Sequence, residues 1–338
     1  ASDCGSECHG FEPRYSPFII NLTGFQSCQV FLFVKNQNVI MKNIFQMFLY
    51  LCFFLLVLSN YSCKDDTVTQ EEAIETDPTV YDEEPSWSND GNWIAYVGGD
   101  NTNGFKVNAI DINSGNKRLL TQVSVGSPTW VKDDEWIVYE KNGNIFKKRI
   151  NGDTATVQLT FTGNCFFPSV SKDGQWIAFD SNIETAENMF CVWKIKIDGT
   201  QRKRILYAPD EGEVRQPDWF PDGIRLAVSR YFVNHGGARE IAIIDTAGNS
   251  IATLTNNVNE TDRVPRVSPD GQYIVWWKDL KVFTIKTDGT ELKQIAVNAI
   301  YPYWSPDGTK IVYTNVTHDD GRIWIMNKNG SYRRKITY

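Results

Sequence analysis

The sequence predicts an all-β fold, a six-bladed β-propeller whose blades each hold four antiparallel strands. Two observations carry this prediction: a proline-centred motif occurs six times, and short apolar runs separated by turns follow each copy. The motif prolines are Pro85, Pro128, Pro168, Pro217, Pro265 and Pro302, with spacings of 43, 40, 49, 48 and 37 residues. A period of about 40 to 45 residues is typical of propeller blades or of helical pairs. The residues around each copy decide between the two.

The last copy, Pro302-Tyr-Trp-Ser-Pro-Asp-Gly308, contains a tight-turn sequence. Proline presets φ for the first central position, aspartate suits the second, and glycine accepts the left-handed conformation that closes a hairpin. After each such turn comes a β-branched and aromatic run, for example Trp93-Ile-Ala-Tyr96. Strands that are apolar on both faces are expected in sheets packed between two neighbours, as propeller blades are.

Each unit also contains a third and a fourth strand signal. The third ends at another turn, as in Trp193-Lys-Ile-Lys-Ile-Asp-Gly199, and the fourth is a short run such as Leu119-Leu-Thr121. Four strands in each of six units predict one propeller over residues 85–338, with each repeat supplying its own blade.

The combined string Pro-x-Trp-Ser-Pro-Asp-Gly, Ile-x-Phe/Tyr, Asp-Gly and Leu-Thr resembles the WD40-like (PD40) repeat of TolB-type propellers. The resemblance extends over all six units and implies the six-bladed fold. The departures are Asp133-Asp134 in place of Asp-Gly, and Val170 and Val267 in place of tryptophan. We assign the motif residues to turns and cores and not to chemistry.

The N-terminal quarter has a different character. Residues 1–40 show no repeat, and we expect them to come from an over-extended gene start and not to belong to the native protein. Residues 41–62 combine Met41, Lys42 and a 15-residue apolar run before Cys63, which indicates a lipoprotein signal peptide with lipidation at Cys63. The run is shorter than the roughly 20 residues of a membrane-spanning helix. An uncleaved membrane helix remains the alternative.

Residues 63–84 are rich in Glu, Asp and Thr, so we expect an acidic linker there. Lys64-Asp65-Asp66 resembles the short tag of some surface-displayed Gram-negative lipoproteins. The expected location is therefore the cell envelope: lipid-anchored to the outer membrane, periplasmic or surface-exposed, with no other membrane contact. The chain has 34 Lys plus Arg and 41 Asp plus Glu, a net charge of −7, which argues against a nucleic-acid partner.

Cys165 and Cys191 lie in the third unit, at the ends of its first and third strands that share a face. An exported protein permits a disulfide between them, although the ends must bend toward each other. The sequence leaves both states open, a disulfide or two unpaired thiols.

Strand direction places the Pro-Asp-Gly hairpins and Asp-Gly turns at one face, which we call the hairpin face. The longer, variable connections lie at the opposite loop face, where we expect ligand binding. Residues leading into the innermost strands should line a central funnel. The ligand-binding candidates are Phe166, Phe167, Arg215, Arg230, Tyr231, His235, Arg263, Arg266 and Tyr301. Arginines beside aromatic rings suit carboxylates, sugars or peptides; the alternative is that these arginines are solvated or paired with nearby carboxylates.

The sequence supplies no catalytic set. It contains no Gly-x-Ser-x-Gly elbow, and its histidines do not belong to a spaced zinc-binding set, so we predict no catalytic residue, metal or cofactor. The function that we expect is an exported, lipid-anchored, non-enzymatic propeller that binds an envelope protein or a cell-envelope glycan. The alternative is a glycan-acting enzyme, a polysaccharide lyase or hydrolase, whose funnel site uses Arg230, Tyr231 and His235.

Overall fold

A computed structural model describes residues 80–338 except 101, 123–125, 152–155, 186–187, 207–211, 233–236, 258–259 and 318–320. The expectations for residues 1–40, for the signal peptide at 41–62 and for lipidation at Cys63 lie outside the described residues. So does the expected role of His235.

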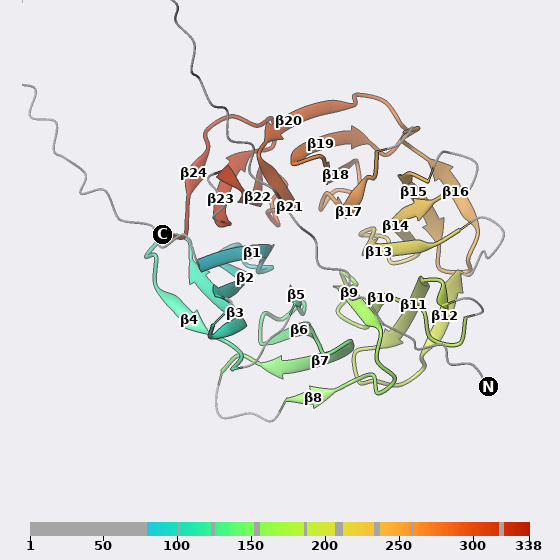
Figure 1. The fold of residues 1–338 in the computed structure, drawn as a ribbon, viewed down its shortest axis with the longest axis horizontal. Helices are drawn as coiled ribbons and strands as arrows, with labels where there is room; N and C mark the ends of the chain where they lie inside the picture. The colour runs from blue at the N-terminus through green and yellow to red at the C-terminus, as the bar shows by residue number, and fades with distance from the viewer. Residues whose placement is uncertain are drawn as a thin grey trace, which may run out of the picture. The chain divides into compact units, whose positions relative to one another are not determined.

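The described chain forms six four-stranded sheets arranged as a ring around a central axis, as Figure 1 shows. Blade 1 contains β1 (Val80–Trp87), β2 (Trp93–Asp100), β3 (Gly104–Asp111) and β4 (Lys117–Leu119); blade 2 contains β5 (Gly126–Trp130), β6 (Trp136–Lys141), β7 (Asn144–Arg149) and β8 (Val157–Gln158). Blade 3 contains β9 (Cys165–Val170), β10 (Trp176–Ser181), β11 (Cys191–Lys196) and β12 (Lys203–Leu206); blade 4 contains β13 (Val214–Trp219), β14 (Arg225–Tyr231), β15 (Arg239–Asp245) and β16 (Ser250–Thr253). Blade 5 contains β17 (Arg263–Val267), β18 (Tyr273–Lys278), β19 (Lys281–Lys286) and β20 (Lys293–Val297); blade 6 contains β21 (Ala299–Trp304), β22 (Lys310–Asn315), β23 (Arg322–Asn327) and β24 (Arg334–Lys335).

Every blade pairs its strands in chain order and antiparallel, so the predicted six-bladed propeller of four-stranded blades is confirmed. The first strand of each blade lies nearest the axis and the fourth lies at the rim (Figure 1). Among the described strands, none is exchanged between blades 1 and 6. The ring closes by packing of β1 against β21 and β22, and Asp82 N donates a 2.9 Å hydrogen bond to Gly321 O. Within the described residues, no helix is long and apolar enough to cross a membrane.

The first strand begins earlier than the repeat pattern suggests. β1 starts at Val80, so the last five residues of the expected linker, 80–84, belong to this strand, and residues 80–83 pair with β2. The acidic composition concealed this extension because Asp82, Glu83 and Glu84 look like solvated linker residues. Asp82 is in fact only 5% exposed.

The repeated turns owe their shape to a serine and an aspartate two residues apart. In four blades the serine hydroxyl donates a 2.6 Å hydrogen bond to the aspartate carboxylate; the pairs are Ser88–Asp90, Ser171–Asp173, Ser268–Asp270 and Ser305–Asp307. The same hydroxyl accepts the first N–H of the next strand, as from Trp93 N to Ser88 Oγ at 2.9 Å. Asp134, which replaces the glycine, adopts φ 55°. Its carboxylate accepts Asn89 N and Asp90 N at 2.8 Å, which ties the hairpins of blades 1 and 2 together.

The threonine of the Leu-Thr pair also has a structural role. Its hydroxyl accepts the backbone N–H of a residue in the third strand of the same blade; the pairs are Thr121 with Val107, Thr160 with Ile145, Thr255 with Ile241, and Thr337 with Ile323, at 2.8 to 3.0 Å. This bond satisfies a buried donor where the short fourth strand ends.

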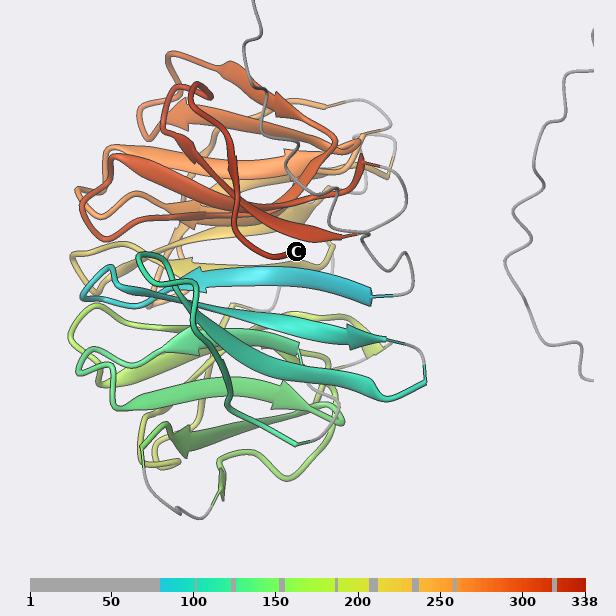
Figure 2. The ribbon, with the colours of Figure 1, turned by 90° about the vertical axis from the view of Figure 1, so that its left-hand side faces the viewer.

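Six hydrophobic clusters fill the six contacts between neighbouring blades. The cluster between blades 6 and 1 joins Trp87 and Ile94 to Val312 and Ile323, all of them buried. The junction of the first and last blades therefore has a core like the other five. Figure 2 shows the blades edge-on, with the short turns of the hairpin face at the left.

Candidate functional site

One irregularity recurs on every innermost strand. The residue before each motif proline has a left-handed backbone with φ between 47° and 55°; these residues are Glu84, Ser127, Phe167, Gln216, Val264 and Tyr301. Pairing with the second strand is interrupted at the same place, as between Arg263 and Arg266. Such a bulge redirects the side chains near it. A left-handed conformation costs energy for any residue other than glycine, and residues in such conformations are found most often at functional sites. The six pre-proline residues therefore form a layer around the axis.

Five members of this layer surround a narrow cavity of about 10 Å³ on the axis, together with three motif prolines and Arg266; the five are Glu84, Ser127, Phe167, Val264 and Tyr301. Of the predicted funnel residues, the structure thus brings Phe167, Arg266 and Tyr301 together. We call the region from this constriction to the loop face the funnel.

Carboxylates occupy the funnel side formed by blades 1 and 2. Glu84 accepts hydrogen bonds from Ser127 N and Ser127 Oγ, and Glu140 accepts Gly143 N at 2.5 Å. The two carboxylates flank Gly126, where an added Cβ would lie 3.3 Å from Glu140 Oε2 and 3.5 Å from Glu84 Oε2.

Burial raises the pKa of Glu84 and Glu140, and also that of Glu83, which precedes Glu84 on β1. Glu83 reaches a pKa of about 7, through burial and the neighbouring charge of Glu84. The pKa values of Glu84 and Glu140 are also raised, mainly by burial; the hydrogen bonds from Ser127 and Gly143, respectively, oppose the shift. These carboxylates are poorly solvated, so a cationic group from a ligand would find acceptors that water does not satisfy fully.

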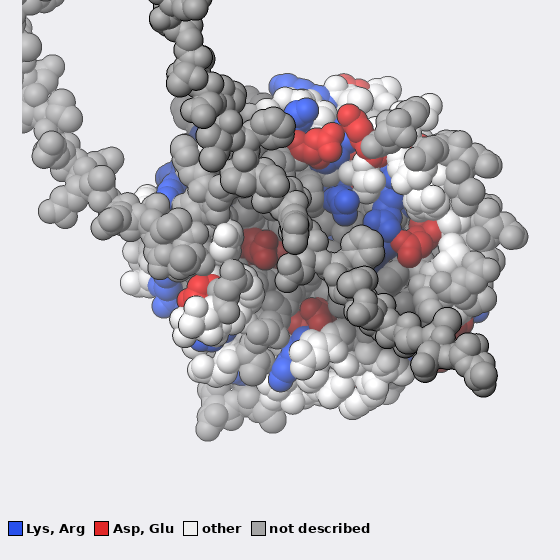
Figure 3. All heavy atoms as spheres, in the orientation of Figure 1, with Lys and Arg blue, Asp and Glu red and all other residues white. Residues whose placement is uncertain are grey.

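Cations and aromatic rings occupy the side formed by blades 4 and 5. The guanidinium of Arg263 lies 5.6 Å from the centre of the Trp277 ring, and this ring meets Tyr301 edge-on at 5.6 Å between centroids. Among the described residues, Arg263 has no carboxylate within ion-pair distance. Figure 3, which views the loop face, shows carboxylates near β1 and β5 and cations near β17 and β13.

Arg215 is already engaged. Its Nε lies 2.7 Å from Asp180 Oδ2, and its guanidinium lies 3.8 Å from the centre of the Phe190 ring. Phe166 packs against the same ring at 5.9 Å. Asp180 is fully buried; burial raises its pKa to about 6 against the lowering effect of Arg215. Arg215 is therefore paired with a carboxylate, as the alternative reading of the sequence has it.

Two candidates of blade 4, Arg230 and Tyr231, lie at the end of β14 and do not reach the axis. Arg230 is buried, with Nη1 donating to Ser250 Oγ of the rim strand at 3.2 Å and its guanidinium 5.0 Å from the Phe232 ring. Tyr231 pairs with Arg239 at the end of β14 and lines neither cavity on the axis. Successive side chains of a strand point to opposite faces of the sheet, and this alternation directs Arg230 into the blade. Proximity to the loop did not reveal that direction.

The two cysteines are free buried thiols in the structure. Both pair in register with Ser181, from opposite sides, since β10 lies between β9 and β11. Two strand spacings of about 4.8 Å each exceed the Cα separation that a disulfide spans. Cys191 Sγ lies 3.4 Å from Ser181 O, and Cys165 Sγ lies 3.8 Å from Ser181 Oγ.

Sequence reasoning missed the acidic side of the funnel. Glu84 was assigned to the linker, yet it occupies the pre-proline position of the first repeat, as Phe167 and Tyr301 do in theirs. Alignment of the repeats on the proline could have found it. Alignment on the proline could not have found Trp277 and Glu140, because they lie on the second strands of their blades. They reach the funnel because they lie near the loop-face ends of these strands. Among the described residues, no group of three or more His, Cys, Asp or Glu is arranged to hold a metal ion.

Comparison with known proteins gives consistent results. Residues 166–338 match the family described as PD40, TolB beta propeller domain. Protein TolB homolog of Chlorobaculum tepidum is 29% identical over 118 residues, which cover 32% of this chain and 26% of that relative. The match thus spans about a quarter of the relative's length.

Solved structures share the fold. TolB from Acinetobacter baumannii superposes with a TM-score of 0.63 at 20% identity, covering 74% of this chain and 65% of that one. An oligogalacturonate lyase from Vibrio parahaemolyticus gives 0.52 at 13% identity, covering 77% and 79%.

Proposed function

This chain belongs to the TolB beta propeller domain family (PD40), and on that premise we propose that it is a non-enzymatic protein that binds a partner at its loop face. The observation that carries the proposal is the funnel with carboxylates on one side and cations with aromatic rings on the other. In a six-membered ring, blades 1 and 2 lie opposite blades 4 and 5. A ligand that enters the funnel therefore meets opposite charges across the axis.

A segment of a protein partner with both acidic and basic side chains fits this arrangement best. Arg263, held over Trp277, offers a planar fork of donors to a carboxylate. Glu84 and Glu140 offer acceptors to a lysine or arginine. Tyr301 lies between the two sides, since its ring meets Trp277 edge-on and it lines the constriction together with Glu84.

The envelope location belongs to the same proposal. The basic start, the apolar run and Cys63 of the sequence favour an exported, lipid-anchored protein whose partner is an envelope protein. A cell-envelope glycan is the other ligand that arginine beside aromatic rings would suit.

The test is capture of envelope proteins and glycans by the full chain, using Arg263→Ala combined with Glu140→Gln as the site variant. Lys203→Ala, an exposed lysine on the rim strand β12, is the matched control. We expect the wild type and the control to retain a partner that the site variant loses. Equal capture by all three would contradict the funnel assignment. Turnover of uronic-acid oligomers in the same assays would favour the glycan-acting alternative instead.

A further inference from the structure

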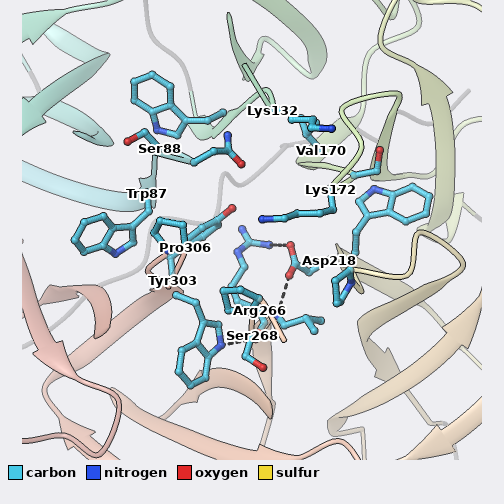
Figure 4. Close-up of a pocket in the computed structure, with 18 residues that line it drawn as sticks. Trp87, Ser88, Lys132, Val170, Lys172, Asp218, Arg266, Ser268, Tyr303 and Pro306 are labelled. Carbon is cyan, nitrogen blue, oxygen red and sulfur yellow. Dashed lines mark hydrogen bonds and ion pairs between the residues drawn. The ribbon is translucent and has the colours of Figure 1, made fainter. Parts of the chain in front are cut away.

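A second cavity, of about 110 Å³, lies at the hairpin end of the axis. Its walls come from the ends of the innermost strands and the first residues of the hairpins in all six blades. Figure 4 shows the lining side chains. The partner contact proposed above lies at the loop face and does not involve this end of the axis.

The charges around this cavity are unbalanced. Its charged lining residues are Lys132, Lys172, Arg266 and Asp218, three cations against one carboxylate. Within the described part of the chain, neither lysine is within ion-pair distance of a carboxylate. In Figure 4 the amino end of Lys172, the guanidinium of Arg266 and the hydroxyl of Tyr303 point toward the same central space. Three hydrogen-bond donors thus converge where an anion would lie.

Asp218 does not satisfy the arginine. Its two carboxylate oxygens already accept Ser169 Oγ and Val267 N, each at 2.8 Å. Arg266 Nη1 lies 3.6 Å from Asp218 Oδ1, which is too far for a hydrogen bond, and this buried atom has no hydrogen-bond partner in the described structure. A buried charged donor without an acceptor is costly, so an added acceptor at this position would lower the free energy.

The remaining walls favour an organic anion. Four indoles, those of Trp87, Trp130, Trp219 and Trp304, line the cavity. The Tyr303 ring lies 5.4 Å from the Arg266 guanidinium. Apolar walls with a few convergent polar groups are the usual design of a small-molecule site, and the volume suits a ligand of only a few carbon atoms.

We propose that this cavity binds a small organic carboxylate, with Arg266, Lys172 and Tyr303 donating to the carboxylate group and Lys132 adding positive charge to the lining. The carboxylate belongs either to a free small acid or to the end of a peptide chain that enters from the hairpin face. The proposal stands on residues of the hairpin end and does not depend on partner binding in the funnel.

Calorimetric titration of the full chain with succinate tests the proposal, at fixed ionic strength set with sodium chloride. We expect saturable binding that Lys132→Ala with Lys172→Ala weakens about tenfold, which corresponds to about 1.4 kcal/mol of binding free energy. Both lysines are exposed, so their replacement leaves the core intact. Lys203→Ala, on the rim strand β12 and outside both cavities of the axis, should leave succinate binding unchanged.

A second arm separates the two sources of the carboxylate. A tripeptide with a free C-terminus and the same tripeptide with an amidated C-terminus are titrated in parallel. Preference for the free C-terminus indicates the peptide source, and binding of succinate alone indicates the free acid. The proposal is overturned if neither succinate nor the free tripeptide binds saturably, or if the double lysine variant binds them as the wild type does.

Discussion

The indole Nε1 of Trp219 donates a 3.1 Å hydrogen bond to the backbone oxygen of Ser169, across the boundary between blades 4 and 3. Trp130 donates in the same way to Ser86 O at 3.2 Å, and Trp304 to Arg266 O at 3.1 Å. In these three blades the motif tryptophan is thus both a core residue and a link to the preceding blade. Where valine replaces it, at Val170 and Val267, the boundary lacks this bond.

Replacing Trp219 with phenylalanine should destabilise the propeller more than the same change at Trp87. Both side chains are buried, but Trp87 Nε1 has no hydrogen-bond partner in the described structure. The comparison isolates the bond because the loss of volume is equal. We expect Trp219→Phe to lower the free energy of unfolding by about 1 kcal/mol more than Trp87→Phe, measured by urea denaturation. Equal losses would show that the bond contributes nothing.

Removing Arg215 should expose the cost of a buried carboxylate. Arg215→Ala leaves Asp180, which is 0% exposed, without its cation, and we expect a loss of about 3 kcal/mol in urea denaturation. Adding Asp180→Asn should restore part of this loss because the charge is then gone. The exposed pair of Arg149 and Glu135 is the control; Arg149→Ala should cost under about 1 kcal/mol. A small effect at Arg215 would mean that Asp180 is already neutral.

Stability should decrease as the pH rises through neutrality. Folding raises the pKa of Glu83 from 4.5 to about 7, so between these values the folded state binds more protons than the unfolded state. The stability contributed by the protonated carboxyl is present at low pH and is lost as the pH rises through about 7. We expect the melting temperature to fall between pH 5.5 and 8, and Glu83→Gln to reduce that slope. The hypothesis fails if the slope is the same in both proteins.

Cys165 and Cys191 should remain unlinked under oxidising conditions. Burial raises the pKa of both thiols, that of Cys191 to about 11, so both should react slowly with iodoacetamide at pH 8 and quickly once the chain is unfolded. Peptide mapping by mass spectrometry locates the alkylated residues. A peptide pair joined through these two cysteines would contradict the strand geometry.

The fold could be predicted from the sequence because its determinants are local and repeated six times. Each of these determinants, the Pro-Asp-Gly turn, the apolar strand runs and the Leu-Thr ending, acts within one blade. Where one copy departs from the pattern, the other copies still identify the element. Asp134 illustrates this tolerance: it departs from the motif, yet it takes the left-handed turn conformation of the glycine it replaces.

The candidate site was predicted only in part. The position of Phe167, Arg266 and Tyr301 at the axis could be predicted because proximity to the motif proline places a residue there. The bulge before that proline could not be predicted from the hydrophobic pattern. The pattern reports which side chains are buried, and it does not change when one residue adopts a left-handed φ. Arg230 is the opposite case: it lies near the loop face, but the alternation of side chains along β14 directs it into the blade.

The hairpin end was overlooked for another reason. Lys132 and Lys172 follow the motif within turns that were assigned to structure alone. Their place beside Arg266 in the lining of one cavity depends on the closed ring, which brings separate blades together at the axis. Local sequence therefore identifies the turn but not the cavity.

The central claim is that a partner contacts the funnel at the loop face, and site-specific photo-crosslinking tests it most directly. A photoreactive phenylalanine analogue is placed at Phe167, which lines the funnel, or at Tyr332, which is 86% exposed in the turn between β23 and β24 on the hairpin face. Irradiation in envelope extract should join a partner to the chain labelled at residue 167 and not to the chain labelled at residue 332. Crosslinking at residue 332 alone would place the interface on the hairpin face and contradict the account.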